Sequence, residues 1–134
     1  MAGEIRIGKV SSVDYNAGMV KVAYADKDGA TTKLLPVFSF NGEYKMPAVD
    51  TYVLVVHLSN GNEAGIVLGT YWNNARSSKA TGKGVFRKEL GSSEGEAFLQ
   101  YNKGTLTIKA DNIKFESSAG TLTLAQIINK LSRI

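Results

Sequence analysis

Apolar and polar residues alternate along the first half of the chain in short runs, and each run ends at a turn signal. The runs cover residues 5–13, 19–25, 31–40, 51–58 and 63–72. Alternation with a period of two, broken by Gly and Asn, is typical of antiparallel β-strands. Five strands in about 70 residues predict a small closed barrel of the OB type. The fourth run is apolar at nearly every position, so we expect burial on both of its faces.

The pattern changes at residue 73, where Asn, Ser, Lys and Gly replace the large apolar side chains. Such a composition is typical of a linker. We therefore expect a barrel at residues 1–73, a linker at 74–83 and a second segment at 84–134. Within the second segment, apolar residues at alternate positions predict further short strands at residues 84–90, 96–101, 104–110 and 112–116.

One internal repeat lies in the second segment. The sequence GTLTI at 104–108 recurs as GTLTL at 120–124, sixteen residues later. Two copies do not establish a solenoid, although the spacing suits strands that each form one rung and then turn at Gly or Asn.

The last eleven residues follow a helical period instead. Thr123 and Gln126 have the spacing of a capping box, and apolar residues follow at steps of three and four. We expect a helix at about residues 124–133. A helix of this length is marginal alone in water, so its apolar face must pack on another surface.

The segment from residue 104 to residue 134 cannot fold as an isolated meander. Even complete burial of its ten sizeable apolar side chains would not offset the entropy lost by ordering thirty-one residues. Association of identical chains around an axis would supply the missing surface and cover the strand edges. The expected fold is therefore all-β: a five-stranded OB-like barrel, a short β segment in which identical chains wrap around a shared axis, and a short C-terminal helix. We expect the shared core to consist of Leu106, Ile108, Ile113, Phe115, Leu122, Leu124, Ile128 and Leu131.

Composition gives no support to catalysis or metal binding. The chain has no cysteine, and its one histidine, His57, lies in an apolar run, where we expect a partly buried strand residue. We expect no enzyme activity, no catalytic residues, no metal site and no cofactor. The N-terminus lacks the pattern of a signal peptide, which predicts synthesis in the cytoplasm without export by the general secretory route.

Single-stranded nucleic acid is the alternative partner, since OB barrels bind it through aromatic side chains and a basic groove. The net charge of +4 is only mildly positive, and the sequence contains no run of like charges. We therefore expect no nucleic-acid partner. The residues available for such binding are Tyr15, Tyr24, Phe38, Phe40, Tyr44, Tyr52, Tyr71, Trp72, Arg76, Lys79, Lys83, Arg87 and Lys88.

Several stretches of the barrel resemble a known family. They are GKV at 8–10, VD at 13–14, GMVKV at 18–22, LPV at 35–37, YKMP at 44–47, VLV at 53–55 and GIVLGTYWN at 65–73. Together they are similar to the N-terminal OB-fold domain of phage baseplate assembly protein V and of related spikes in contractile tails and type VI secretion. The last stretch is the most specific, and the resemblance covers about residues 5 to 73.

That resemblance implies a homotrimer at the centre of a baseplate. The barrels would contact the hub protein and the tail tube, and the C-terminal segments would form a short intertwined trimeric β-helical or β-prism needle that pierces the target cell envelope. A separate tip protein is a further possible partner. The expected location is a virion or tail-like particle assembled in the bacterial cytoplasm. The short linker leaves no room for the lysozyme domain of some members, and a single histidine cannot form their His-x-His iron site. Whether residues 84–101 belong to the needle or to a collar stays open.

Overall fold

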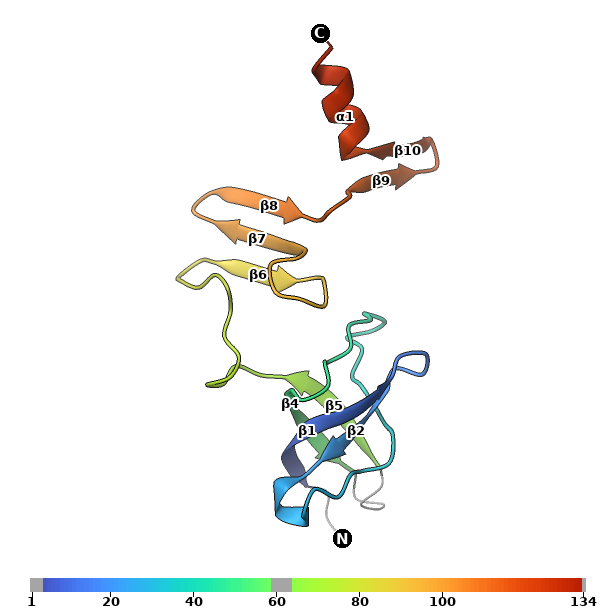
Figure 1. Cartoon of the computed structure of the whole chain (residues 1–134), viewed down its shortest axis with the longest axis vertical. Helices are drawn as coiled ribbons and strands as arrows, with labels where there is room; N and C mark the ends of the chain where they lie inside the picture. The colour runs from blue at the N-terminus through green and yellow to red at the C-terminus, as the bar shows by residue number, and fades with distance from the viewer. Residues whose placement is uncertain (1–3, 59–63, 134) are drawn as a thin grey trace. The chain divides into compact units, whose positions relative to one another are not determined.

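The computed structural model describes residues 4–58 and 64–133 and shows a mostly β chain with one short α-helix (Figure 1). The chain divides into two compact units, Met1–Arg76 and Ser77–Ile134. No helix in the described part of the chain is both long enough and apolar enough to cross a bilayer.

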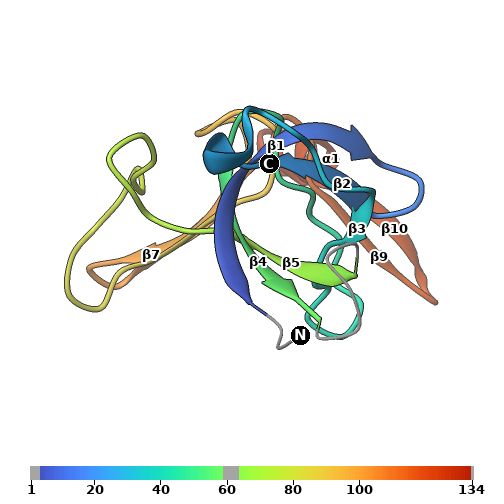
Figure 2. The same ribbon diagram turned by 90° about the horizontal axis from the view of Figure 1, so that it is seen from below.

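A five-stranded antiparallel sheet forms the first unit. The sheet order is β3-β2-β1-β4-β5. Just after β3, Val37 forms a parallel bridge with Val67 of β5, and the Phe38 N–H donates to the Val67 carbonyl at 2.8 Å. The sheet is thereby nearly closed, as predicted (Figure 2). The elements are β1 (Ile5–Asp14), β2 (Met19–Ala23), a 3-10 turn (Ala25–Lys27), β3 (Leu35–Pro36), β4 (Tyr52–His57) and β5 (Gly65–Thr70).

Small branched side chains fill the barrel. Seven of them are at most 1% exposed: Val10, Val20, Val22, Leu35, Val53, Val55 and Val67. They come from all five strands and alternate with outward residues, which is the expected pattern for a barrel interior. Gly8 belongs to this interior because a Cβ there would lie 2.3 Å from Cγ1 of Val22. No larger residue fits at that position without displacing the core.

The third predicted strand is much shorter than the run at residues 31–40. Only Leu35–Pro36 pairs as a strand, and Thr31 adds an isolated bridge to Ala23. After Val37 the backbone turns sharply, with φ of 46° at Phe40 and 62° at Asn41. Positive φ values are incompatible with a continuing strand. The turn signal between the fourth and fifth predicted runs, at residues 59–62, lies outside the described residues.

Burial of the fourth strand on both faces was also predicted, and it is wrong for the single chain. Val53, Val55 and His57 are buried, whereas Tyr52 is 42% exposed and Leu54 and Val56 are only half-buried. One face of β4 lines the barrel and the other forms part of its outer surface.

His57 is a strand residue, as predicted, but it is buried rather than partly buried, and both of its ring nitrogens are bonded. Its Nδ1 lies 3.3 Å from the Ala64 carbonyl, and its Nε2 lies 2.6 Å from the Tyr24 hydroxyl. Because a carbonyl can only accept, Nδ1 carries the proton in the neutral ring, and Tyr24 donates to Nε2. Burial raises the pKa of the Tyr24 hydroxyl, against the opposing effect of Arg6, whose guanidinium lies 4.2 Å from the Tyr24 ring centroid.

The second unit contains two small antiparallel sheets followed by the helix. The first sheet has the order β6-β7-β8, and the second is a hairpin of β9 and β10. Residues 84–101 thus share a sheet with the strand predicted at 104–110. The elements are β6 (Phe86–Glu89), β7 (Phe98–Asn102), β8 (Thr105–Lys109), β9 (Lys114–Ser117), β10 (Gly120–Thr123) and α1 (Leu124–Leu131).

The internal repeat marks the return strands of two hairpins. Its copies begin at Gly104 and Gly120, and strands β8 and β10 run through them. Lys103 and Gly104 have φ of 50° and 84°, the signs that a type I′ hairpin turn requires at its two central residues. The repeat therefore reflects strands that pair back within the chain, and it does not mark successive rungs of a solenoid.

The C-terminal helix begins at the predicted capping box and ends two residues earlier than predicted. Thr123 Oγ1 accepts from the Gln126 N–H at 3.2 Å, and Gln126 Oε1 accepts from the Thr123 N–H at 2.9 Å. The helix ends at Leu131, and the Ser132 N–H still donates to the Ile128 carbonyl. At the start of the helix, the backbone N–H groups of Thr123 and Gln126 are therefore each bonded by the other residue's side chain.

Candidate interface on the C-terminal unit

The sheet β6-β7-β8 has one apolar face, which its register defines. Phe86 lies opposite Tyr101, which lies opposite Leu106. Two residues further along the strands, Leu99 lies opposite Ile108 and Lys88 completes the row. Because residues that are paired or two apart share a face, these side chains form one surface. We call Phe86, Leu99, Tyr101, Leu106 and Ile108 the sheet face.

Most of the sheet face is open to solvent in the single chain. Phe86, Tyr101, Leu106 and Ile108 are between 46% and 62% exposed, and Leu99 is half-buried. Lys88 is the charged residue of this face, and it lies on the edge strand β6. A lysine at such an edge can keep its ammonium in water while its methylene stem covers apolar surface.

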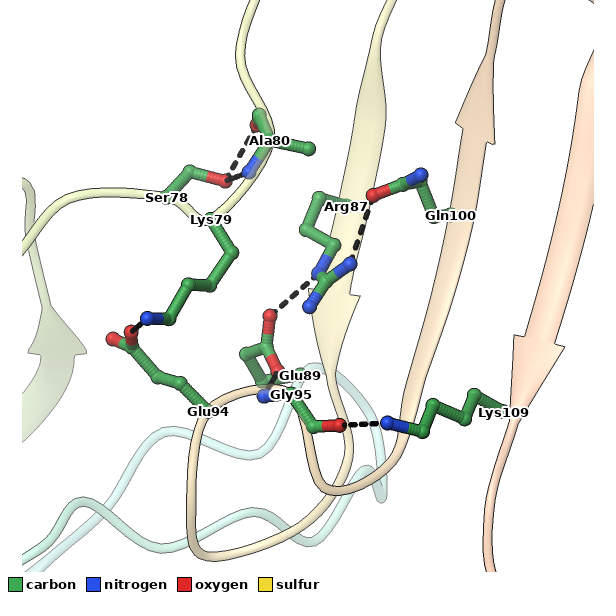
Figure 3. Close-up of polar contacts among 9 residues, drawn as sticks. All are labelled: Ser78, Lys79, Ala80, Arg87, Glu89, Glu94, Gly95, Gln100 and Lys109. Carbon is green, nitrogen blue, oxygen red and sulfur yellow. Dashed lines mark hydrogen bonds and ion pairs between the residues drawn. The ribbon is translucent and has the colours of Figure 1, made fainter.

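The opposite face of the same sheet is polar and internally bonded (Figure 3). Arg87 donates from Nε to Glu89 at 2.6 Å and from Nη1 to Gln100 at 2.8 Å, and its guanidinium carbon lies 3.5 Å from the centroid of the Phe98 ring. The Lys109 ammonium donates to the Gly95 carbonyl at 2.9 Å. The charged side chains Arg87, Glu89 and Lys109 of this face are therefore all bonded within the chain.

Glu89 connects this polar face to the loop between β6 and β7. Its carboxylate also accepts from the Gly95 N–H at 2.7 Å. The hydrogen bond from Arg87, followed by that from Gly95, lowers the pKa of the Glu89 carboxyl. A second charge pair joins Lys79 to Glu94 of the same loop at 3.6 Å. The loop is held by charged contacts at several points.

The hairpin β9–β10 repeats the division into two faces. Phe115 lies opposite Leu122, and the Leu124 N–H donates to the Ile113 carbonyl at 2.8 Å. Ile113, Phe115, Leu122 and Leu124 therefore share one face, which we call the hairpin face. The other face is polar: Lys114 pairs with Glu116 at 3.6 Å, and the Thr121 hydroxyl donates to Glu116 at 3.4 Å.

The helix presents a third apolar surface. Leu124, Ile127, Ile128 and Leu131 lie at steps of three and four, so they share one side of α1. None of the described residues of α1 is buried, and Leu131 is 63% exposed. A helix of eight residues with an uncovered apolar side has little stability of its own in water.

The structure places the predicted core residues on these three surfaces. Leu106 and Ile108 belong to the sheet face, Ile113, Phe115, Leu122 and Leu124 to the hairpin face, and Ile128 and Leu131 to the helix. Seven of the eight are between 38% and 63% exposed in the single chain, and Ile113 is half-buried. Their joint burial in an oligomer stays a prediction.

Three apolar residues of the sheet face were missing from the predicted core: Phe86, Leu99 and Tyr101. Part of the signal was present, because the apolar residues Leu99 and Tyr101 alternate with the polar Gln100. What the sequence lacked was the register that pairs 86 with 101 and 101 with 106. Without it, the strands at 84–101 could not be assigned to a sheet.

The residues considered for nucleic-acid binding occupy varied settings. Tyr24 is buried in the barrel, and Phe38 packs edge-on against Phe40 with ring centroids 4.7 Å apart. The Tyr44 hydroxyl donates to the Tyr15 carbonyl at 2.9 Å. Of the basic residues, Lys79 and Arg87 lie in the ion pairs described above. Among the described residues there is also no cluster of three or more His, Cys, Asp or Glu side chains suited to a metal ion.

Comparison with known proteins adds no assignment, since the chain matches none of the protein-family profiles and none of the curated protein sequences.

Proposed function

We propose that the protein is the central spike of a contractile phage tail or of a phage-tail-like bacteriocin. It would act as a homotrimer whose barrels join the baseplate hub and the tail tube, and whose C-terminal unit forms a short needle that pierces the target envelope. The observation that carries this proposal is the division of the C-terminal strands into exposed apolar faces and internally bonded polar faces.

Three copies arranged around an axis would bury the sheet, hairpin and helix faces against one another. The polar faces, where Arg87, Glu89 and Gln100 are already bonded to each other, would then face solvent. Burial of apolar surface contributes about 25 cal/mol per Å². The uncovered apolar residues of the second unit are therefore a substantial driving force for association.

Pairing within the chain favours one of the two needle types considered above. Strands β6, β7 and β8 pair with each other within one chain. This arrangement supports a prism in which each copy contributes one wall, more than a fully intertwined β-helix. The number three rests on the barrel's resemblance to baseplate spikes, and the sheet order is consistent with an OB-like barrel.

The action we propose is mechanical. Sheath contraction would drive the needle forward, and the barrels would transmit force from the hub. A binding module for single-stranded nucleic acid is less well supported, because Tyr24 is buried and the cations Lys79 and Arg87 are paired with Glu94 and Glu89. Stacking platforms and free cations are what such binding requires.

Immunogold electron microscopy of tail particles from the producing strain tests this function. Antibodies against the chain should label one end of each particle, at the baseplate, and label nothing in particles from a strain in which the gene is deleted. Label along the sheath, or particles that lack the protein, would refute the proposal.

A further inference from the structure

A tight left-handed turn lies between β3 and β4. Three successive residues there have positive φ: 46° at Phe40, 62° at Asn41 and 112° at Gly42. The turn is closed by the N–H groups of Gly42 and Glu43, which both donate to the Ser39 carbonyl. Asparagine tolerates this backbone region better than most residues, and glycine enters it at no steric cost. The conformation of the turn therefore favours the dipeptide Asn41-Gly42 at its centre.

Asparagine followed by glycine is also chemically unstable. Asparagine is a thermolabile residue, because the backbone nitrogen of the next residue can attack its side-chain amide carbon. A side chain on the next residue obstructs this attack, and glycine has none. A Cβ built on Gly42 would have no heavy atom within 4 Å outside the two neighbouring residues, so the space beside this residue is open. Any other residue at position 42 would strain the turn, so the fold retains the residue that makes this dipeptide reactive.

The reacting groups are accessible to solvent. Asn41 and Gly42 are both exposed, and among the described residues none forms a hydrogen bond with the Asn41 side-chain amide. The Gly42 nitrogen lies 3.2 Å from the carbonyl oxygen and 3.2 Å from the hydroxyl oxygen of Ser39. Both distances are at the long end of the range for hydrogen bonds, so the Gly42 N–H is weakly held. Ser39 is itself exposed, so the proton of this N–H can pass to water.

We infer that Asn41 is a site of spontaneous deamidation, which proceeds through a cyclic succinimide. The Gly42 nitrogen gives up its proton to water and forms a bond with Cγ of Asn41. The bond from Cγ to Nδ2 breaks, and the side-chain nitrogen takes up a proton from solvent and leaves as ammonia. Water then adds to one of the two carbonyl carbons of the succinimide and opens the ring. Opening at one carbonyl gives aspartate, and opening at the other gives isoaspartate.

The reaction would turn a neutral turn into an anionic one without the help of an enzyme. The new carboxylate would lie one residue from Phe40, whose ring packs edge-on against Phe38 with centroids 4.7 Å apart. Isoaspartate would also add one methylene to the main chain inside the turn. A positive φ is unfavourable for a bulky residue such as Phe40, and a longer main chain would let this turn relax. This inference is independent of the proposed function, because it concerns one turn within one chain.

The chain contains a matched internal control for this reaction. Asn16 is exposed in the β1–β2 turn, but the residue after it is Ala17, whose side chain obstructs the attack. Cleavage by trypsin after the lysines at 9, 21, 33 and 45 gives one peptide of residues 10–21 and one of residues 34–45. Asn16 and Asn41 are the only side-chain amides in these two peptides. A gain in mass therefore reports each site separately.

The test follows the folded full-length chain over several weeks at pH 8 and 37 °C. Mass spectrometry of the two peptides measures the rate of deamidation at each site, and fragmentation distinguishes isoaspartate from aspartate. A parallel sample in urea gives the rates in the unfolded chain, and circular dichroism verifies that the first sample stays folded.

We expect Asn41 to deamidate at least about ten-fold faster than Asn16 in the folded chain, because glycine offers no obstruction to the attack. Isoaspartate and aspartate should both appear at position 41. Similar rates at the two sites would overturn the inference. An Asn41 that reacts in urea but not in the folded chain would also overturn it, since the turn would then protect this residue. Aspartate without isoaspartate would exclude the succinimide route and overturn it as well.

Discussion

Ile108 of β8 lies directly opposite Leu99 of β7, on the sheet face, and more than half of the Ile108 side chain is exposed. Within the described chain Leu99 is half-buried, whereas Ile108 stays largely uncovered. In the proposed trimer, three copies of the pair would approach one another.

Replacing Ile108 with Asp should therefore abolish association and leave the barrel folded. Burying an unpaired carboxylate costs several kcal/mol, which is at least about a hundred-fold in the association constant. Sedimentation velocity at micromolar concentration measures the effect. The matched control is Thr105→Asp on the polar face of the same strand, which should still associate. Equal behaviour of the two variants would show that the sheet face is not the interface.

The helix cap offers a prediction about the end of the chain. Thr123→Ala removes the hydroxyl that accepts from the Gln126 N–H, and loss of such a cap costs about 1 kcal/mol. Helical circular dichroism should fall, and the first thermal transition should shift down. Thr121→Ala, on the polar face of the adjacent strand, serves as control. An unchanged signal in Thr123→Ala would mean that packing alone fixes the helix.

The barrel interior has one polar pair whose loss should be costly. Tyr24→Phe leaves Nε2 of the buried His57 without its donor, a change that costs roughly 1 to 3 kcal/mol. Urea unfolding of the barrel measures the loss. The control Tyr52→Phe removes a hydroxyl from the exposed, outward face of β4 and should leave the free energy of unfolding nearly unchanged. Equal stability of both variants would contradict the bonding we describe for His57.

Tyr24 also gives the barrel a dependence on alkaline pH. Its pKa is raised by burial, so the neutral form is favoured in the folded state. Its contribution to stability is full below the usual pKa of 10.0 and is lost as pH rises through the folded value. Melting temperatures between pH 8 and 11 should decline less steeply in Tyr24→Phe. Parallel declines would show that this hydroxyl stays accessible to solvent.

Glu89 gives the second unit the opposite dependence. Its lowered pKa means that the carboxylate is favoured in the folded state, by its bonds to Arg87 and Gly95. The stability it contributes is present above the usual pKa of 4.5 and is lost as pH falls through the lower folded value. Glu89→Gln should flatten the acid side of the thermal stability profile, whereas Glu116→Gln should not. Identical profiles for wild type and Glu89→Gln would refute this role.

The positions of the strands and of the helix could be predicted from the sequence better than the way in which the strands pair. Five barrel strands and the cap at Thr123 follow from local alternation and local hydrogen bonds, which a single sequence contains. The shortness of the third strand did not, because the positive φ at Phe40 occurs at an aromatic residue, a type that usually avoids it.

The faces of the second unit were predictable only in part. Alternation identified Leu106 and Ile108, but the partners Phe86, Leu99 and Tyr101 depend on a register set by the turn at Lys103 and Gly104. Register is a non-local property, and a shift of one residue moves every side chain to the other face. The exposure of the outward face of β4 was not predicted, because a run of apolar residues indicates burial but does not show what would cover it.

The mass of the purified full-length chain in solution tests the central claim most directly. Light scattering at micromolar concentration should give three times the chain mass of 14.4 kDa, about 43 kDa. A mass of 14.4 kDa that persists as the concentration is raised would contradict the account, because the exposed sheet, hairpin and helix faces would then need no partner.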